Sequence, residues 1–486
     1  MREEIRENID IWSKENIGYL KELLSDNSDI VYRSFYLQDR NVALVYVDGL
    51  VDKMLINEHV VEQIMESYRE VNNAAEIKDK LLSVSDIKEI DNMVEGVKAI
   101  LSGDTLMFVD GLKTAYVIAS RGWPARGVSE PSGETVIRGS REGFVETIRF
   151  NTALIRRRVR DINLKIKSES IGVRSKTDVA IMYIEDIVNK EALKELNNRI
   201  QDINIDAILD SSYISSFIED NKYSPFPQIQ STERPDVVAA ALYEGRIAIL
   251  VDNSPFAIIV PTIMANLFQS PDDYYQRWLD SSVIRMLRFL SIFISIIMPG
   301  LYVAITSFHT SIIPTKLAYS IAASREGVPF PAFIEAIIME VSLALLIEAV
   351  ARLPKAIGAT IGIVGGLIIG QAAVSAGIVS PIMIIILGLT AITTFITPNY
   401  EITAAFRYIR FLLIILSSIL GLYGIILGLI IVLIHLVKLK SFTIPYLAPM
   451  VSPNFKDFKD LFIRIPIKYL KERPAYMKTG DKIRQK

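Results

Sequence analysis

Residues 289–308 read FLSIFISIIMPGLYVAITSF and carry no charged side chain. This is about the length that a helix needs to cross the hydrocarbon core of a membrane. Two further runs are equally free of charge, SPIMIIILGLTAITTFIT at 380–397 and FLLIILSSILGLYGIILGLIIVLI at 411–434. Residues 1–280, in contrast, are mixed and charged, as in a water-soluble region. These patterns predict an α+β soluble N-terminal region followed by an all-α membrane domain that crosses the bilayer several times.

The composition argues against several classes of site. The chain has 486 residues, a net charge of −2, no cysteine, and three widely separated histidines. Without cysteine there is no disulfide, thiolate zinc site or iron–sulfur cluster, and the distant histidines do not predict a metal site. A near-neutral chain also lacks the basic surface of a nucleic-acid-binding protein. The first residues, MREEIRENIDIW, contain no apolar signal-peptide core. We therefore expect no metal, no cofactor and no nucleic-acid partner.

Two segments of the soluble region are similar to two later segments in the same order. NVALVYVDGLVDK at 41–53 is similar to DVAIMYIEDIVNK at 178–190, and SGDTLMFVDGLKTAYVI at 102–118 is similar to EGRIAILVDNSPFAIIV at 244–260. The first pair predicts a strand that turns into a helix, and the second predicts two strands around a tight turn. The offsets are 137 and 142 residues. Chance similarity is the alternative to a duplication, which predicts two related α/β subdomains.

A segment rich in arginine, glycine and proline lies between the two copies, RGWPARGVSEPSGETVIRGSREGF at 121–144. It contains neither a P-loop pattern nor a dinucleotide fingerprint. In the residues that follow, Phe144, Ile148, Ile155, Val159 and Ile162 recur at helical spacing and predict an amphipathic helix. That helix either lies against anionic lipid or an acidic partner, or packs on its own domain with its arginines solvated or paired to neighbouring carboxylates. We expect four arginines to hold assembly contacts: Arg126, Arg138, Arg141 and Arg149.

Four glycines of the membrane region are spaced four residues apart: Gly358, Gly362, Gly366 and Gly370. On a helix this spacing forms a groove where another backbone can approach closely, either between subunits or within one chain. Three polar residues of the same helix could face water, and they are candidates for lining the pore or for gating: Thr360, Gln371 and Ser375.

The segment 331–354 is a less typical membrane helix because it carries Glu335, Glu340 and Glu348. A carboxylate in hydrocarbon is costly, so these side chains should face water, a partner or the interface. Glu348 precedes Arg352 by four residues, which favours a salt bridge along one helix. Glu335 or Glu340 could instead attract cations, since rings of carboxylates from several subunits select cations in channels.

The charges also predict topology. The soluble region has no export signal, and the tail 438–486 contains twelve lysines and arginines against four acids, so both should face the cytoplasm. Five apolar candidates conflict with the even number of crossings that this requires, and a re-entrant or interfacial segment at 331–350 would leave four. Five or six crossings remain open. The predicted units are two α/β subdomains at 1–120 and 171–280, a connector with its helix at 121–170, a membrane domain at 281–437 and a basic tail at 438–486.

Several long motifs resemble the A subunit of GerA-type spore germinant receptors. In the soluble region these are the connector sequence at 121–160, YSPFPQIQSTERPD at 223–236 and GRIAILVDNSPFAIIVPT at 245–262. In the membrane region they are REGVPFPAFIEAIIMEV at 325–341, IGIVGGLIIGQAAVSAGIVSP at 361–381 and TPNYE at 397–401. The resemblance spans nearly the whole chain.

The resemblance implies a multi-pass protein of the spore inner membrane that works with a transporter-like B subunit and a lipoprotein C subunit. It further implies that copies of the chain assemble, as a pentamer, into a ligand-gated channel for monovalent cations that opens early in germination. Closely related paralogues are signal-amplifying channels, and the motifs do not separate the two groups. The apolar runs by themselves are also compatible with a permease-like protein or a non-conducting scaffold. No catalytic motif is evident in the sequence, so we do not expect an enzyme.

Overall fold

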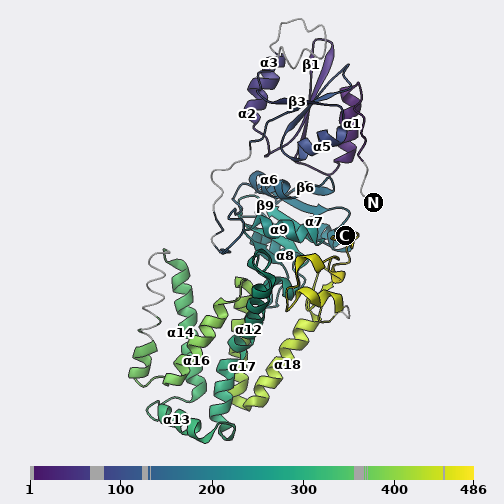
Figure 1. Cartoon of the computed structure of the whole chain (residues 1–486). Helices are drawn as coiled ribbons and strands as arrows, with labels where there is room; N and C mark the ends of the chain where they lie inside the picture. Colours follow the sequence, from purple (N-terminus) through teal and green to yellow (C-terminus); the bar gives the residue numbers. More distant parts are fainter. Residues whose placement is uncertain are drawn as a thin grey trace.

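The computed structural model describes residues 5–65, 82–122, 130–131, 133–354, 366, 368, 370–451 and 455–485. The protein is elongated, and a first sheet, a second sheet and a group of long helices follow one another along its length (Figure 1). The second sheet therefore lies between the first sheet and the helices.

The first sheet has five antiparallel strands in the order β1 (Ile30–Leu37), β2 (Arg40–Val47), β4 (Thr105–Val109), β5 (Ala115–Ile118) and β3 (Ile87–Ile90). Successive side chains of a strand point to opposite faces of a sheet. Ala43 and Val45 of β2 pack beneath α1 (Ser13–Leu23) and α5 (Met93–Leu101). Leu44 packs on the other face, beneath α2 (Lys53–Ile56) and α3 (Glu62–Met65). The sheet is thus covered on both faces.

The second sheet also has five antiparallel strands, in the order β6 (Leu164–Ile171), β7 (Thr177–Ile184), β9 (Ile247–Val251), β10 (Ala257–Val260) and β8 (Gln230–Thr232). One face packs against α6 (Ile148–Arg158) and α9 (Pro235–Tyr243). The other face packs against α7 (Lys190–Gln201) and α8 (Ser211–Ile218).

The two sheets share one strand order, so β1 to β5 correspond to β6 to β10 in sequence order. Val42 pairs with Val109 in the first sheet, and Val179 pairs with Val251 in the second. These two pairs are related by the same offsets of 137 and 142 residues that relate the similar sequence segments. The duplication inferred from the sequence is therefore seen as a repeat of sheet topology, and both predicted hairpin turns join adjacent antiparallel strands.

The second unit begins earlier than the predicted boundary at residue 171. Strand β6 ends at Ile171, and the apolar side of α6 packs on the second sheet through residues that include Ile148, Ile155 and Val159. Of the two arrangements predicted for the amphipathic helix, the structure has the one in which it packs on its own domain. The predicted connector range 121–170 therefore contains the first helix of the second unit and all but the last residue of its first strand.

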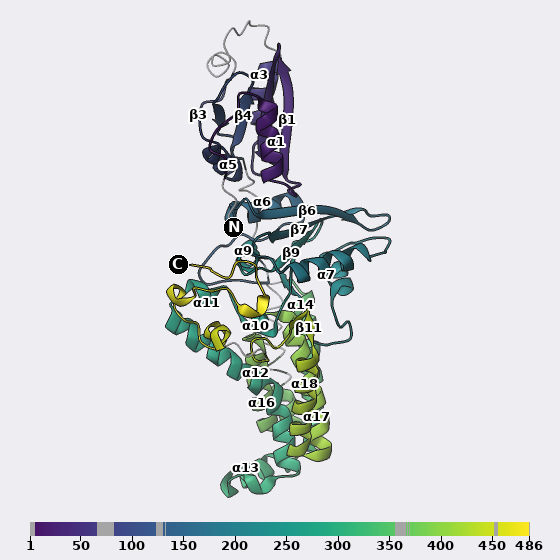
Figure 2. The ribbon, with the colours of Figure 1, turned by 90° about the vertical axis from the view of Figure 1, so that its right-hand side faces the viewer.

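Two helices of the described residues are long and apolar enough to cross a membrane, α12 (Trp278–Ser307) and α17 (Tyr400–Leu420). Two other apolar helices are shorter, α16 (Pro381–Phe395) and α18 (Leu422–Lys438). Helix α14 (Ala332–Arg352) carries the three glutamates, and the short α13 (Thr315–Arg325) lies at the end farthest from the sheets (Figures 1 and 2). Residues 355–365, which belong to a further apolar stretch, lie outside the described residues.

The apolar run at 411–434 is not one helix. It is divided at Gly421, whose φ of +62° lies in the left-handed region that favours glycine. Helix α17 ends before this residue, and α18 begins after it and runs back beside α17. The two helices cross closely at Gly424, where a Cβ atom would lie 2.1 Å from the carbonyl oxygen of Leu416. Hydropathy alone does not show this turn, because both halves of the hairpin are apolar.

The tail returns to the second sheet unit. It begins with the small hairpin of β11 (Lys440–Ser441) and β12 (Ile444–Pro445). Met477 near its end is buried with Ile263 and Ile444, and its carbonyl accepts a hydrogen bond of 2.9 Å from Asn189 Nδ2. The chain thus enters α12 and leaves α18 at the same end of the helices, next to the second sheet (Figure 1).

Candidate functional site

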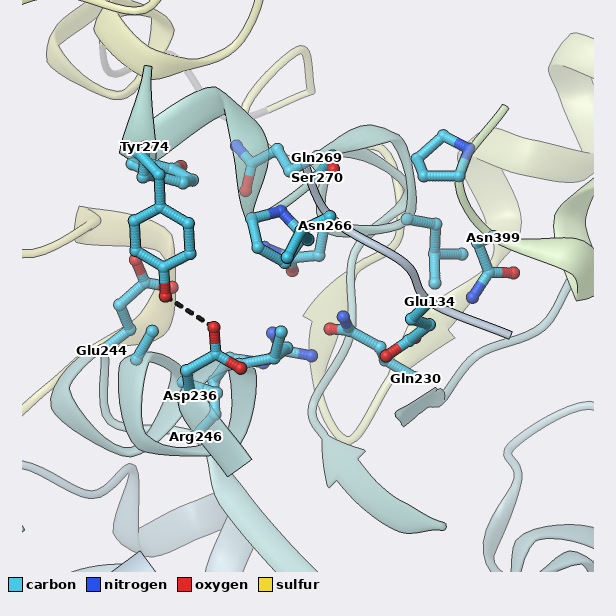
Figure 3. Close-up of a pocket in the computed structure, with 18 of the residues that line it drawn as sticks. Glu134, Gln230, Asp236, Glu244, Arg246, Asn266, Gln269, Ser270, Tyr274 and Asn399 are labelled. Carbon is cyan, nitrogen blue, oxygen red and sulfur yellow. Dashed lines mark hydrogen bonds between the residues drawn. The ribbon is translucent and has the colours of Figure 1, made fainter. Parts of the chain in front are cut away.

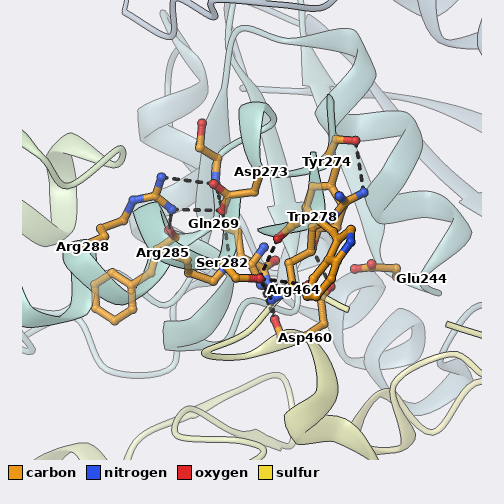
Figure 4. Close-up of polar contacts among 12 residues, drawn as sticks. Glu244, Gln269, Asp273, Tyr274, Trp278, Ser282, Arg285, Arg288, Asp460 and Arg464 are labelled. Atoms are coloured by element: carbon orange, nitrogen blue, oxygen red, sulfur yellow. Dashed lines mark hydrogen bonds and ion pairs between the residues drawn. The ribbon is translucent and has the colours of Figure 1, made fainter. Parts of the chain in front are cut away.

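Two buried arginines near the start of α12 lie at the junction between the second sheet unit and the long helices. Arg285 and Arg288 are three residues apart, so they share one side of the helix. Both bind Asp273 of the short helix α11 (Asp272–Tyr275): Arg285 Nε lies 3.2 Å and Arg288 Nη1 3.0 Å from Asp273 Oδ2. Figure 4 shows this arrangement, in which the buried carboxylate of Asp273 binds two guanidinium groups.

A carboxylate of the tail completes this group, which we call the junction cluster (Asp273, Tyr274, Arg285, Arg288 and Asp460). Asp460 Oδ1 lies 2.8 Å from Arg285 Nη1, and Asp460 Oδ2 accepts a hydrogen bond of 2.7 Å from Tyr274 Oη. Burial, and then the neighbouring Asp460 carboxylate, raises the pKa of Tyr274 well above its ordinary value, so its phenol remains a donor. The junction cluster therefore fastens the tail to the first turns of α12.

A cavity of about 680 Å³ lies beside the junction cluster, between the second sheet, the connector and the loop before α17 (Figure 3). This volume is typical of small-molecule sites. Burial raises the pKa of Glu244 and lowers the pKa of Arg246 to about 10. Tyr275 Oη donates a hydrogen bond of 2.5 Å to Asp236 Oδ2. The polar lining includes Glu134, Gln230, Asp236, Glu244, Arg246, Asn266 and Asn399.

The cavity has a polar lining but offers no metal-binding group in the part of the chain that the structure describes. There, no three histidine, aspartate or glutamate side chains are arranged to hold a metal ion. The carboxylates of the cavity face arginine, tyrosine and threonine partners instead. Such a lining suits the recognition of a polar group or the docking of a chain segment.

The connector is docked on the second sheet unit through buried Arg234. Its Nη1 donates to the carbonyl oxygen of Glu134 at 3.1 Å, and its Nη2 donates to the carbonyl oxygen of Ser140 at 2.8 Å. Thr232 Oγ1 donates to Glu134 Oε2 at 2.5 Å. Burial raises the pKa of Glu134 to about 7, against the lowering effects of Thr232 and Arg234, while the Glu233 charge adds to the rise.

A fully buried arginine of α6 joins the two sheet units. Arg156 Nε and Nη2 bind the two oxygens of Asp29 at 3.0 and 2.9 Å, and Nη2 also donates to Asn27 Oδ1 at 2.8 Å. The neighbouring Arg157 and Arg158 bind Glu142 of the connector. These contacts show that part of the arginine-rich sequence serves contacts within the chain.

The arginines that the sequence assigned to assembly are differently placed. Arg138, Arg141 and Arg149 are exposed, and Arg141 Nε lies 3.9 Å from Glu130 Oε1. Arg126 lies outside the described residues. An exposed guanidinium is available to another chain, so their assembly role stays a prediction. The sequence signal did not distinguish them from the buried Arg156, because all of them belong to the same arginine-rich stretch.

Glu335 and Glu340 are buried, and each faces an arginine of the same chain. Glu335 Oε1 lies 3.0 Å from Arg325 Nη2, and Glu335 Oε2 accepts a hydrogen bond of 2.8 Å from the backbone nitrogen of Ser380. Glu340 Oε2 lies 3.1 Å from Arg410 Nε of α17. The predicted pair of Glu348 and Arg352 is present at 2.5 Å on the surface of α14. Cation attraction by Glu335 or Glu340 stays a prediction. In this structure Arg325 is the counter-ion of Glu335, and Arg410 is the counter-ion of Glu340.

Arg410 gathers polar groups from several helices. Its Nη1 donates to the carbonyl and hydroxyl oxygens of Ser295 in α12 and to Thr394 Oγ1 in α16, each at 3.2 Å. Together with Glu340 of α14, this arginine therefore connects four helices. The sequence pattern indicates Glu340 but not Arg410, although an arginine directly before a long apolar run is itself a signal of a functional site.

The glycine stripe is only partly described, because Gly358, Gly362 and Thr360 lie outside the described residues. A Cβ atom at Gly366 would meet nothing within 4 Å, and one at Gly370 would lie 3.6 Å from Ile384 Cγ2. Among the described residues of the stripe, Gly366 and Gly370 are therefore not at a close helix crossing within the chain, and packing between subunits stays a prediction. Gln371 and Ser375 are exposed. The close crossing at Gly424 and Gly428 was missed, although their four-residue spacing carried the same signal.

The chain matches a known protein family over most of its length. The family described as Bacillus/Clostridium GerA spore germination protein matches residues 18–476. The chain is similar to spore germination protein GerLA of Bacillus cereus, with 44% identity over 95% of both chains. It is also similar to the uncharacterized membrane protein YfkQ of Bacillus subtilis, with 43% identity over 96% of this chain and 92% of that one.

A solved structure is similar to the N-terminal part. It is the crystal structure of the N-terminal domain of the A subunit of the Bacillus megaterium spore germinant receptor GerK3, with 33% sequence identity and a TM-score of 0.43. The similarity covers 54% of this chain and 99% of that chain.

Proposed function

Because the chain belongs to the GerA family of spore germination proteins, we propose that it is a membrane subunit of a spore germinant receptor. In this proposal, copies of the chain assemble, as a pentamer, around a path for monovalent cations that opens in response to germinant. The alignment with a spore germination protein over 95% of both chains supports the germination role. The two long apolar helices support a place in a membrane.

The junction cluster is the observation that carries the gating part of the proposal. Arg285 and Arg288 fix the first turns of α12 to Asp273 of the second sheet unit, and Asp460 adds the tail. A buried ion pair is sensitive to geometry, because a displaced partner leaves an uncompensated charge. A movement of the soluble region on binding a partner or ligand would therefore displace α12 with it.

The ion path in this proposal involves the carboxylate of Glu340. In the described conformation Arg410 compensates its charge. An opening that separates α14 from α17 would release the carboxylate to water, where it attracts cations. The exposed Gln371 and Ser375 face the same path or the next copy in this scheme. The role is not enzymatic.

Both soluble parts face the spore core in this proposal, and the helices lie in the spore inner membrane as a multi-pass domain. The entry into α12 and the exit from α18 at one end of the helices support an even number of crossings. The B and C subunits of the receptor are the proposed partners, by family resemblance.

Flux measurements test the proposal. The full chain is reconstituted into potassium-loaded vesicles, alone and with its B and C subunits, and cation release is followed with and without germinants. Glu340→Gln should change flux, whereas the matched control Glu348→Gln, which alters an exposed pair, should not. Release without any partner or germinant would favour a signal-amplifying channel, and no release under any condition would favour a non-conducting scaffold.

A further inference from the structure

The loop that follows α8 presents a fully exposed tyrosine next to the end of the apolar helix α18. Tyr223 is 99% exposed, and the nearby Lys222 and Pro225 are exposed as well. The proposed channel function does not use this loop, which we call the 219–226 loop. A tyrosine with no contact for its ring needs another explanation, because the burial of tyrosine rings is favourable wherever a partner surface exists.

Hydrogen bonds, both within it and to neighbouring segments, hold the 219–226 loop in place. The side chain of the buried Gln228 accepts from the backbone nitrogen of Asn221 at 2.8 Å and donates to its carbonyl oxygen at 2.9 Å. Asn221 Oδ1 accepts in turn from the backbone nitrogen of Tyr223 at 3.1 Å. Asp220 accepts from the backbone nitrogen of Phe442 in the tail at 2.9 Å. The exposure of Tyr223 is therefore imposed by the loop.

The loop is also fixed against the last turns of α18. Ser224 Oγ lies 2.9 Å from His435 Nε2, and the ring of Phe226 lies 6.0 Å from the imidazole. Phe226 is buried in one cluster with Leu436 of α18 and Phe406 of α17. Tyr223, one residue before Ser224, thus lies near the level of His435 along the helix.

This level is where the surface of α18 changes from apolar to basic. Exposed apolar residues continue to Val437, and exposed lysines follow at Lys438 and Lys440. His435 is three residues before Lys438, a rise of about 4.5 Å. The head-group layer on each side of a bilayer is roughly 5–8 Å thick, so this distance fits within it. If α18 lies in the membrane, Tyr223 lies at the membrane–water interface.

The side chains around Tyr223 suit that position. Tyr213 and Phe217 of α8 are four residues apart on one side of the helix and are both more than a third exposed. Lys222 Nζ lies 5.5 Å from the centre of the Phe217 ring. Tyrosine is enriched at membrane interfaces, and lysine is attracted to anionic head groups.

We propose that the 219–226 loop and the exposed face of α8 form an interfacial anchor, in which Tyr223 inserts among the head groups and Lys222 binds anionic lipid. The anchor fixes the second sheet unit at a defined height over the bilayer. The inference depends on the proposed membrane location of α18, and it goes beyond the channel function because it assigns a lipid contact to the soluble region.

Lipid quenching of a single tryptophan tests the anchor. The full chain, with Trp12, Trp123 and Trp278 replaced by phenylalanine, receives Tyr223→Trp and is reconstituted into vesicles of phosphatidylcholine and phosphatidylglycerol. Tyr36→Trp, at an exposed site of the distant first sheet, is the aqueous control. Ile431→Trp, on the exposed side of α18, is the membrane control. Because position 223 makes no ring contact, the substitution leaves the fold intact.

We expect lipids brominated on the acyl chain near the head group to quench the indole at position 223 several-fold more than the indole at position 36. Iodide in the water should instead quench the indole at position 36 more strongly. Adding Lys222→Glu, or omitting phosphatidylglycerol, should reduce the lipid quenching. Quenching at position 431 without quenching at position 223 would overturn the anchor and leave the membrane proposal intact. The same holds if position 223 is shielded from both quenchers, which would indicate a protein contact. Quenching of position 431 by iodide but not by the brominated lipids would overturn the membrane location itself.

Discussion

Docking of the connector on the second sheet unit should weaken as the pH rises through neutrality, because of Glu134. Burial raises the pKa of this carboxyl to about 7 in the docked connector, whereas its ordinary value is 4.5. Between these two values the docked state binds a proton that the undocked state has released. The docked state is therefore most stable below the lower value, loses stability as the pH rises between them, and changes little above the higher value.

The size of the effect follows from the two pKa values. From about pH 6 to about pH 8 the ratio of docked to undocked connector should fall about tenfold, which corresponds to about 1.4 kcal/mol. Glu134→Gln should remove the pH dependence of docking, because the amide has no charge to bury and can still accept the hydrogen bond of Thr232.

Hydrogen exchange of the connector amides measures the docking. The full chain in detergent is compared at both pH values, after correction for intrinsic exchange rates, over the described residues 133–142. Glu130→Gln is the matched control, because Glu130 is largely exposed in the same connector and should leave the pH dependence unchanged. The role assigned to Glu134 is wrong if the unaltered chain shows no loss of protection, or if the loss persists in Glu134→Gln.

Three further predictions concern contacts within and between chains. Arg156→Met should lower the free energy of unfolding by about 3–5 kcal/mol in denaturant titrations, because it leaves the buried Asp29 without its counter-ion; an unchanged midpoint would contradict this. Gly424→Ala should lower the melting temperature in detergent, because its Cβ would lie 2.1 Å from Leu416 O. Gly388→Ala is its control, since nothing lies within 4 Å of that Cβ, and equal melting temperatures would argue against the close crossing. Charge reversal of any of the exposed connector arginines, Arg138, Arg141 or Arg149, should impair oligomer formation, which native gels measure. A normal oligomer in these variants would show that the arginines are not needed for assembly.

The sheet repeat could be predicted from the sequence because the two copies retain the same order of strands and turns. Val42 and Val179 begin the buried part of equivalent strands, and their surroundings were similar enough in sequence to be matched. The boundary of the second unit could not be placed in the same way. Strand β6 reads LKIKSESI and α6 is rich in arginine, so neither is as apolar as a typical core element.

The polar contacts among the helices could be predicted only in part. The pair of Glu348 and Arg352 depends on one helical turn and was therefore accessible from the sequence. Glu340 finds its counter-ion 70 positions further along the chain, in Arg410. Such a pair depends on how α14 packs against α17, which a hydropathy pattern does not contain. The pair of Asp460 and Arg285 could not be predicted for the same reason, because the two residues lie far apart in the sequence. Arg285 and Arg288, in contrast, follow their shared partner Asp273 closely.

Three of the buried ion-pair groups join separate elements of the chain. Arg156 and Asp29 join the two sheet units, Asp273 joins the second unit to α12, and Glu340 joins α14 to Arg410 of α17. Apolar contacts tolerate small displacements, whereas a buried ion pair loses most of its stabilisation when its geometry changes. Junctions of this kind favour discrete arrangements over continuous bending. Under the gating that we propose, the placement of these pairs favours a switch with few states.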